Sequence, residues 1–276
     1  MLTKSQILLP PKPLASCIAG CIVRDTRQAT LSDTDRVNYF PATPLFSATL
    51  ILEGRLHIAH DIINLDDLRE RPSAAPKLFG TPQNRPQMSW SPGPILALTI
   101  AFFPDAWQRL GGTLDGAPPE SLSTALEILE TEPLETAWPG FWAKMSAIWM
   151  ETQDRDHAAG WTGSDKLKDW ANHLIGKLVQ TGSGRSLRSA QRKLQRWTGQ
   201  NRQTLEFFAK VEEVHRLVAA EPTASPAELA VEAGFSDQSH LGRVLKRATG
   251  FSPVSLNQKI ATEEPFWCYR LLGERF

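Results

Sequence analysis

One short motif occurs twice in the second half of the chain, 51 residues apart. Residues 192–199 read RKLQRWTG and residues 243–250 read RVLKRATG, so five of the eight positions are identical. An internal repeat constrains the fold strongly, because each copy is expected to adopt the same local structure. The sequences that flank the two copies differ. This pattern predicts two copies of one small helical module instead of a solenoid.

The second copy carries clear start and stop signals for two helices. Residues 225–228 (SPAE) have the capping-box pattern, with serine at the cap, proline in the first helical position and glutamate three residues after the cap. Gly234 supplies a tight turn. Ser236 or Asp237 then caps a second helix, which Gly250 ends. A helix, a glycine-containing turn and a second helix are the layout of a DNA-binding helix-turn-helix unit.

The helix that carries the motif is amphipathic in both copies, with an apolar stripe opposite a polar face. In the first copy the stripe is Leu187, Ala190, Leu194 and Trp197, and the polar face carries Arg188, Gln191, Arg192 and Gln195. In the second copy the stripe is Leu241, Leu245 and Ala248, and the polar face carries Ser239, His240, Arg243 and Lys246 or Arg247. Arginine can bind guanine through two hydrogen bonds, and glutamine can bind adenine in the same way. These faces therefore predict contact with the major groove of DNA.

The charge of the chain is unevenly distributed. The whole chain has 30 Lys or Arg and 30 Asp or Glu, so its net charge is zero. Residues 180–260 alone contain twelve basic and seven acidic residues. Six of the basic residues lie between Arg185 and Arg202, where there is no acidic residue. This excess is typical of a surface that contacts phosphates.

Residues 233–243 (AGFSDQSHLGR) and 249–253 (TGFSP) resemble the signature of the AraC/XylS-type transcription regulators. In that family a long helix joins two helix-turn-helix units, and residues 205–220 match it here. The resemblance covers about residues 165–260 and is weaker in the first unit, where a leading helix of about 165–180 is followed by 181–184 (TGSG). It implies base-reading roles for Arg188, Gln191 and Arg192 in the first unit and for Ser239, His240 and Arg243 in the second. Arg196 and Arg247 complete the expected DNA-binding residues.

The first 115 residues have the pattern of a mainly β domain. Residues 45–52 and 55–58 predict two strands joined by a tight turn at Glu53-Gly54, and residues 95–103 predict another strand between two prolines. Regular short strands with such turns are typical of a barrel or sandwich. Residues 40–44, 80–86 and 97–107 resemble the cupin-like sensor domains that precede the DNA-binding module in many AraC-type regulators.

We therefore expect an α+β chain with two domains, an N-terminal barrel-like sensor and a C-terminal all-α domain with two helix-turn-helix units. The expected segments are a sensor at 1–118, a helical linker or dimerisation segment at 119–158, a DNA-binding domain at 159–262 and an aromatic tail at 263–276. Ser121 is the expected N-cap of the first linker helix, and residues 141–151 are the expected second helix. The aromatic tail is expected to dock back onto the protein.

An enzyme built on the front domain is the main alternative. A metal-dependent cupin needs several histidines and a carboxylate in one cluster. Only His57 and His60 lie close in sequence, near Glu53, and residues three apart on a strand point to opposite faces. We therefore expect no catalytic residue, metal or cofactor. A second alternative is a small-molecule-binding protein whose helical domain does not read DNA.

The expected partners are double-stranded operator or promoter DNA, a small-molecule effector and a second copy of the chain, with RNA polymerase a further candidate. The apolar residues of segment 115–155 predict either a dimer surface or ordinary packing against the front domain. Arg85 and Trp90 are candidate effector contacts, although an arginine that anchors a turn and a tryptophan in the core are the favoured interpretations of these two residues. Three cysteines without a Cys-x-x-Cys pair favour a reducing cytoplasm, and no segment has the pattern of a membrane span or a secretory signal.

Overall fold

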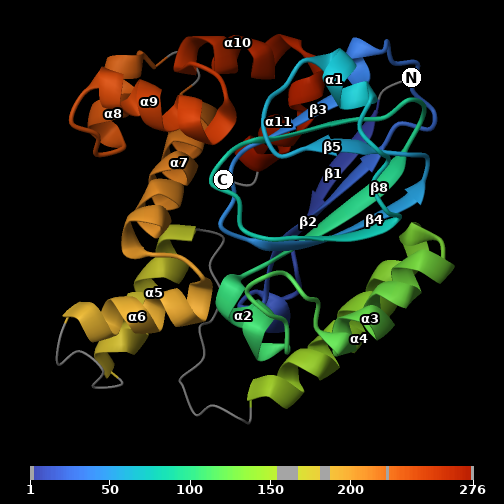
Figure 1. Cartoon of the computed structure of the whole chain (residues 1–276), viewed down its shortest axis with the longest axis horizontal. Coiled ribbons are helices and arrows are strands. Elements are labelled where there is room, and N and C mark those ends of the chain that lie inside the picture. The colour runs from blue at the N-terminus through green and yellow to red at the C-terminus, as the bar shows by residue number, and fades with distance from the viewer. Residues whose placement is uncertain (1–2, 154–166, 181–186, 222–223, 275–276) are drawn as a thin grey trace.

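The computed structural model describes residues 3–153, 167–180, 187–221 and 224–274 (Figure 1). Two antiparallel sheets form the front part of the chain, and helices form the back part. The five-stranded sheet has the order β1-β2-β8-β4-β6, and the three-stranded sheet has the order β3-β7-β5. The strands are β1 Lys4–Leu8, β2 Ile18–Asp25, β3 Val37–Phe40, β4 Phe46–Glu53, β5 His57–Ala59, β6 Lys77–Gly80, β7 Gln87–Trp90 and β8 Leu96–Phe102. The two sheets do not close into a complete barrel. The front domain is nevertheless barrel-like, as the sequence predicts.

The strands predicted at 45–52 and 55–58 both form, but they do not pair with each other. β4 pairs with β6 and β8, whereas β5 pairs with β7 in the other sheet. Gly54 makes the connection with a φ of 89°, and a Cβ atom there would lie 2.5 Å from the Pro94 carbonyl oxygen. The glycine therefore allows a sharp change of sheet instead of the expected hairpin.

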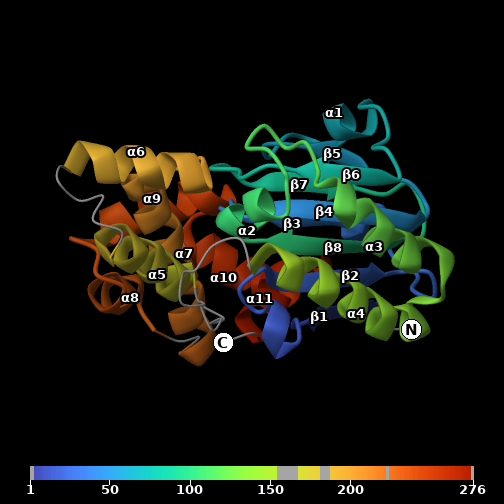
Figure 2. The same cartoon turned by 90° about the horizontal axis from the view of Figure 1, so that it is seen from below.

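The largest core lies between the five-stranded sheet and the helices that cover it. Along β8, buried Leu96, Leu98, Ile100 and Phe102 alternate with half-buried residues, as a strand between two different environments requires. The buried set packs with residues of α2 Pro104–Arg109, α3 Glu120–Thr131 and α4 Leu134–Gln153 (Figure 2). The opposite face of this sheet looks toward the three-stranded sheet.

The helical hairpin of α3 and α4 departs from two expectations. Pro119 is the N-cap of α3, so Ser121 lies inside the first turn and the predicted cap is wrong. α4 begins at Leu134 and continues through Pro139, which makes it longer than the predicted 141–151. Five of the seven large apolar residues that led us to expect a dimer surface are buried within this chain: Leu122, Leu126, Leu129, Phe141 and Trp149. The other two, Trp142 and Ile148, are half-buried. Packing of the five buried residues against the sheet accounts for their apolar character.

The back part contains α5 Leu167–Gln180, α6 Leu187–Thr198, α7 Arg202–Ala220, α8 Pro226–Glu232, α9 Gln238–Thr249 and α10 Pro253–Thr262. The predicted turn at 181–184 and Arg185 lie outside the described residues. A short 3-10 helix, η4 Glu264–Phe266, leads into α11 Trp267–Glu274. α11 packs against β1, β3 and α7, so the aromatic tail docks onto the protein as expected (Figure 1). No helix in the described ranges is long and apolar enough to cross a membrane.

α7 carries a histidine that the fold keeps neutral. The ring of His215 lies 5.7 Å from the ring of Tyr269 on α11, centre to centre. Its Nε2 atom is buried, and no described residue lies within hydrogen-bond distance of it. Burial lowers the pKa of His215 to about 4, because the charged imidazolium loses its hydration there.

We expect mild acid to destabilise the protein through His215. Between pH 6.5 and pH 4 the unfolded chain binds a proton that the folded chain excludes, so the free energy of unfolding falls as the pH falls, by about 2 kcal/mol at pH 4.5. Denaturant unfolding at pH 7 and pH 4.5 measures this loss, and it should shrink in His215→Gln. Exposed His60 provides the matched control, since His60→Gln makes the same change of side chain at the surface. An equal acid loss in wild type and His215→Gln would contradict the assignment.

Candidate nucleic-acid interface

The two repeats end in the same local structure. Thr198 and Thr249 are fully buried, and each donates its hydroxyl to the carbonyl four residues earlier, at 2.9 and 2.8 Å. Each hydroxyl oxygen also accepts a backbone N–H two residues later in the chain. Gly199 and Gly250 follow with φ of 71° and 85°, the left-handed conformation that ends a helix at low cost for glycine. The Thr-Gly pair of the repeat is therefore a helix-ending device used twice.

The second helix-turn-helix unit forms as its sequence predicts. Ser225 and Glu228 make both hydrogen bonds of a capping box at the start of α8. Gly234 turns the chain with a φ of 71°. Asp237, not Ser236, caps α9 by accepting the amide N–H of His240 at 2.7 Å. That hydrogen bond and one from the Ser236 hydroxyl lower the pKa of the Asp237 carboxyl, because they stabilise its charged form.

The predicted DNA-binding residues belong to α6 and α9, and α7 runs between these two helices (Figure 1). On α6 the apolar stripe faces inward, where Leu194 is buried and Ala190 and Trp197 pack against the core. The side chain of Leu187 is outside the described set. The exposed predicted residues are Arg188, Gln191, Arg192 and Arg196 on α6 and Ser239, Arg243 and Arg247 on α9. None of these five arginines forms an ion pair with another described residue.

Two of the predicted residues make contacts within the protein. His240 is half-buried, and its ring lies edge-on to Phe235 at 5.2 Å, with Nδ1 3.1 Å from the Ser236 hydroxyl. The guanidinium of Arg247 lies 4.8 Å from the ring centre of Phe207 on α7. His240 therefore holds the start of α9, and Arg247 presents its charge from a fixed position beside α7.

The comparisons with known proteins agree with this geometry. Residues 182–259 match a family described as a helix-turn-helix domain. The chain carries an AraC-type helix-turn-helix domain. It is thus a DNA-binding transcription regulator. No curated protein matches the chain.

Solved structures with a similar course of the chain have low sequence identity. ToxT from Vibrio cholerae is 12% identical, over 82% of this chain and 95% of ToxT, with a TM-score of 0.39. ToxT with a bound unsaturated fatty acid is 11% identical, over 80% and 94%, with a TM-score of 0.37. The AraC-like transcriptional activator CuxR is 9% identical, over 99% and 100%, with a TM-score of 0.26.

The front domain makes a hydrogen bond to the same backbone position near the end of α6 and of α9. The side-chain amide of Gln108 on α2 donates to the Trp197 carbonyl at the end of α6, at 2.6 Å. The backbone N–H of Ala42 donates to the Ala248 carbonyl at the end of α9, at 2.7 Å. Trp197 and Ala248 occupy the same position in the two repeats. Sequence reasoning missed Gln108 and Ala42, because both lie far along the chain from the motif that they contact.

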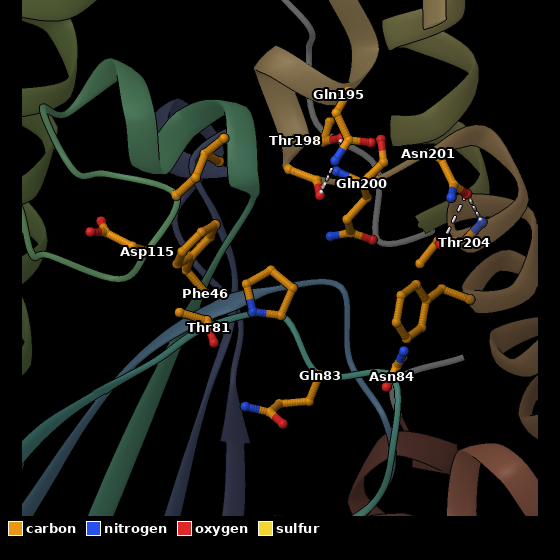
Figure 3. Close-up of a pocket in the computed structure, with 14 residues that line it drawn as sticks. Phe46, Thr81, Gln83, Asn84, Asp115, Gln195, Thr198, Gln200, Asn201 and Thr204 are labelled. Atoms are coloured by element: carbon orange, nitrogen blue, oxygen red, sulfur yellow. Dashed lines mark hydrogen bonds between the residues drawn. The ribbon is translucent and has the colours of Figure 1, made fainter. Parts of the chain in front are cut away.

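A cleft lies between the front domain and the AraC-type domain (Figure 3). Its volume is about 510 Å³. Phe46, residues 81–84, Leu114 and Asp115 form one wall, and residues 195 and 198–201, Thr204 and Phe208 form the other. Gln200 joins the walls, since its side chain is buried and its Nε2 donates to the Pro44 carbonyl at 2.9 Å. The described lining residues offer amides, hydroxyls and one carboxylate, and none of them is basic.

Three of the other candidate site residues, His57, Arg85 and Trp90, have structural partners. His57 Nδ1 lies 2.6 Å from the Arg71 carbonyl, and His60 is exposed. No group of three His, Cys, Asp or Glu side chains arranged for a metal occurs among the described residues. Arg85 pairs with Asp61, and the Trp90 indole donates to Asp33, so both anchor loops of the front domain.

We expect Gln108→Leu to loosen the end of α6 alone. The substitution removes one hydrogen bond to the Trp197 carbonyl, which is worth about 1 kcal/mol. Native-state hydrogen exchange should show protection at the Gly199 and Gln200 amides falling roughly fivefold. Protection at the Gly250 amide should stay at the wild-type level, as should all of these amides in the exposed control Gln258→Leu. Uniform loss of protection at both helix ends would refute a local role for Gln108.

Proposed function

We propose that this regulator reads a specific DNA sequence with α6 and α9, which enter the major groove at successive positions along the duplex. The observation that carries the proposal is the shared structure of the two repeats: both helices end in the same buried Thr-Gly turn and present exposed basic faces. A solvated surface helix would have no reason to repeat both features.

The exposed residues divide into two groups by the part of the DNA that each can contact. Arg188, Gln191 and Arg192 on α6, and Ser239 and Arg243 on α9, lie in the N-terminal and middle turns, from which side chains of recognition helices contact base edges. Arg196 and Arg247 lie near the helix ends and are placed to contact phosphates. His240 contributes to DNA binding in two ways: it presents the edge of its ring, and its contacts hold the start of α9 in place.

We expect Arg192→Ala and Arg243→Ala each to relax base preference at one or two positions of the site. Loss of a bidentate contact with guanine should cost about 1–3 kcal/mol of discrimination. Selection of bound sequences from a random duplex pool, followed by affinity measurements at fixed salt, measures both effects. Arg202→Ala is the matched control, because Arg202 pairs with Glu206 at the start of α7. Retention of the full wild-type motif by both variants would sink the assignment.

We further propose that a small molecule in the cleft changes the affinity for DNA. The wall formed by residues 195, 198–201, 204 and 208 spans the end of α6, the turn after it and the start of α7. A ligand that touches both walls therefore acts on how α6 lies against the front domain. Such coupling is reciprocal and typically amounts to about 1–3 kcal/mol. The lining favours an uncharged ligand that bears several hydroxyl or amide groups, with Asp115 accepting from one of them.

A thermal-shift screen of sugars, polyols and nucleosides tests the cleft. A compound that raises the melting temperature should also change DNA affinity, and Asp115→Asn should weaken both effects roughly tenfold through one lost charge-assisted hydrogen bond. Asp66→Asn, which alters an exposed carboxylate on the small helix α1 Leu65–Arg69, is the control. A compound whose effect on DNA binding survives Asp115→Asn unchanged acts elsewhere.

The remaining expectations follow from this role. We propose that the protein acts as a homodimer in the cytoplasm, that it contacts RNA polymerase and that it catalyses no reaction. The proposed dimer surface lies on α4, where Trp138 and Trp142 are half-buried and stacked and Met150 is exposed. It does not include the predicted residues that are buried within the chain. Sedimentation at micromolar concentration with and without DNA distinguishes a dimer from the 30.7 kDa monomer.

A further inference from the structure

The helix α9 is held at its end by the front domain. The Ala248 carbonyl accepts the backbone N–H of Ala42 at 2.7 Å. A Cβ atom at Gly250 would lie 2.7 Å from the Cγ1 atom of Ile62, so the front domain also lies directly against the turn that ends α9. These contacts fix the end of the helix, whereas Ser239 lies in its first turn. The start of α9 therefore needs other partners.

The second helix-turn-helix unit has an apolar core of its own. Val214 and Leu217 of α7 pack there with buried residues of α8, of α9 and of the turn between them: Leu229, Ala230, Ala233, Phe235, Leu241 and Leu245. The first unit differs, because four buried side chains of α5, α6 and the start of α7 belong to the same core as the five-stranded sheet: Trp170, Leu174, Leu194 and Leu205. The start of α9 is thus placed mainly by its packing against α7 and α8.

A lysine of α7 binds the turn that precedes α9. The Nζ atom of Lys210 donates to the Gly234 carbonyl at 3.2 Å and lies 5.0 Å from the ring centre of Phe235. Gly234 turns the chain with a φ of 71°, and Phe235 is buried. The face of an aromatic ring carries partial negative charge, which attracts a cation placed over it. One ammonium group therefore holds both the backbone and a ring of the turn to α7.

The turn is connected in its own right to the first residues of α9. The Phe235 ring meets the His240 ring edge-on at 5.2 Å, and His240 Nδ1 lies 3.1 Å from the Ser236 hydroxyl. The His240 amide N–H donates to the Asp237 carboxylate that caps the helix, at 2.7 Å. Contacts thus continue without a break from Lys210 to the first turn of α9.

A second contact between a cation and a ring joins α7 to the other end of α9. The guanidinium carbon of Arg247 lies 4.8 Å from the ring centre of Phe207. Phe207 and Lys210 are three residues apart on α7, so they lie on the same side of that helix. α7 supplies the ring in one contact and the cation in the other. Together the two contacts fix the direction of α9 relative to α7, because they act at both of its ends.

We propose that Lys210 is a positioning residue for the DNA-reading face of α9. It sets the direction in which α9 leaves the turn, and with it the direction of Ser239 and Arg243 toward the major groove. This inference rests on the proposed base reading by α9, and it names a residue outside α9 on which that reading depends. Paired hydrogen bonds to a base require a fixed geometry, so a small tilt of α9 weakens base discrimination while contacts with phosphates persist.

Selection of bound sequences from a random duplex pool, followed by affinity measurements at fixed salt, tests this role in the full-length protein. Lys210→Met keeps the apolar stem and removes the ammonium group. It should lower discrimination roughly tenfold at the base pairs that Arg243→Ala affects, and leave discrimination unchanged at those that Arg192→Ala affects. Lys210→Arg retains a cation and should restore most of the preference. Exposed Lys144 on α4 is the matched control, since Lys144→Met removes the same charge far from α9 (Figure 1).

Native-state hydrogen exchange without DNA measures how firmly the start of α9 is held. Lys210→Met should lower the protection of the His240 and Leu241 amides severalfold, because the start of α9 opens more readily once the turn is released from α7. Protection of the Gly250 amide should stay at the wild-type level, since the front domain holds that end of the helix. Lys144→Met should leave all three amides unchanged.

The outcomes separate this role from the proposed function. A uniform loss of affinity across all sequences in Lys210→Met would make Lys210 a phosphate contact and would overturn its positioning role. Unchanged protection of the His240 and Leu241 amides would overturn it as well. If Arg243→Ala relaxes the motif and Lys210→Met does not, base reading by α9 stands and only the role of Lys210 is wrong. If Arg243→Ala keeps the full motif, base reading by α9 is wrong, and so is the positioning role that rests on it.

Discussion

The hydrogen bonds from the front domain to the ends of α6 and α9 constrain the rest of the structure. Gln108 and Ala42 donate to the same carbonyl position in the two repeats, so the front domain holds α6 and α9 at matched points. The loop that carries Ala42 also packs with Phe208, Val211 and Ala248 in one small apolar cluster. The relative placement of α6 and α9 therefore depends on contacts with the front domain.

The apolar core continues this connection. Trp170 of α5 packs against Phe103 at 5.4 Å and donates to Asp105, and Leu194 and Leu205 belong to the same core as the five-stranded sheet. Removal of the front domain would expose these side chains to water. A change in the front domain can thus reach the recognition helices through direct contacts, which is the physical requirement for coupling between two sites.

The front domain has an unusual division of its interior. Its apolar core lies on the outer face of the five-stranded sheet, beneath α2, α3 and α4, while the space between the sheets holds Arg24, Asn38 and Ser89 in buried positions. Those polar groups are satisfied in part by the tail, through Glu264 and Trp267.

Local sequence determined the helix-turn-helix units, because their signals act over three or four residues: the Ser225 capping box, Gly234, Asp237 and the two Thr-Gly endings. Amphipathic spacing likewise predicted which residues of α6 and α9 are exposed. Tertiary structure alone decided which strands pair across Gly54, that the apolar face of α3 and α4 is covered by the sheet, and that Gln108, Ala42 and Arg24 meet segments distant in the chain. Those contacts join residues with no local pattern in common, so only the folded arrangement brings their donors, acceptors and apolar surfaces together.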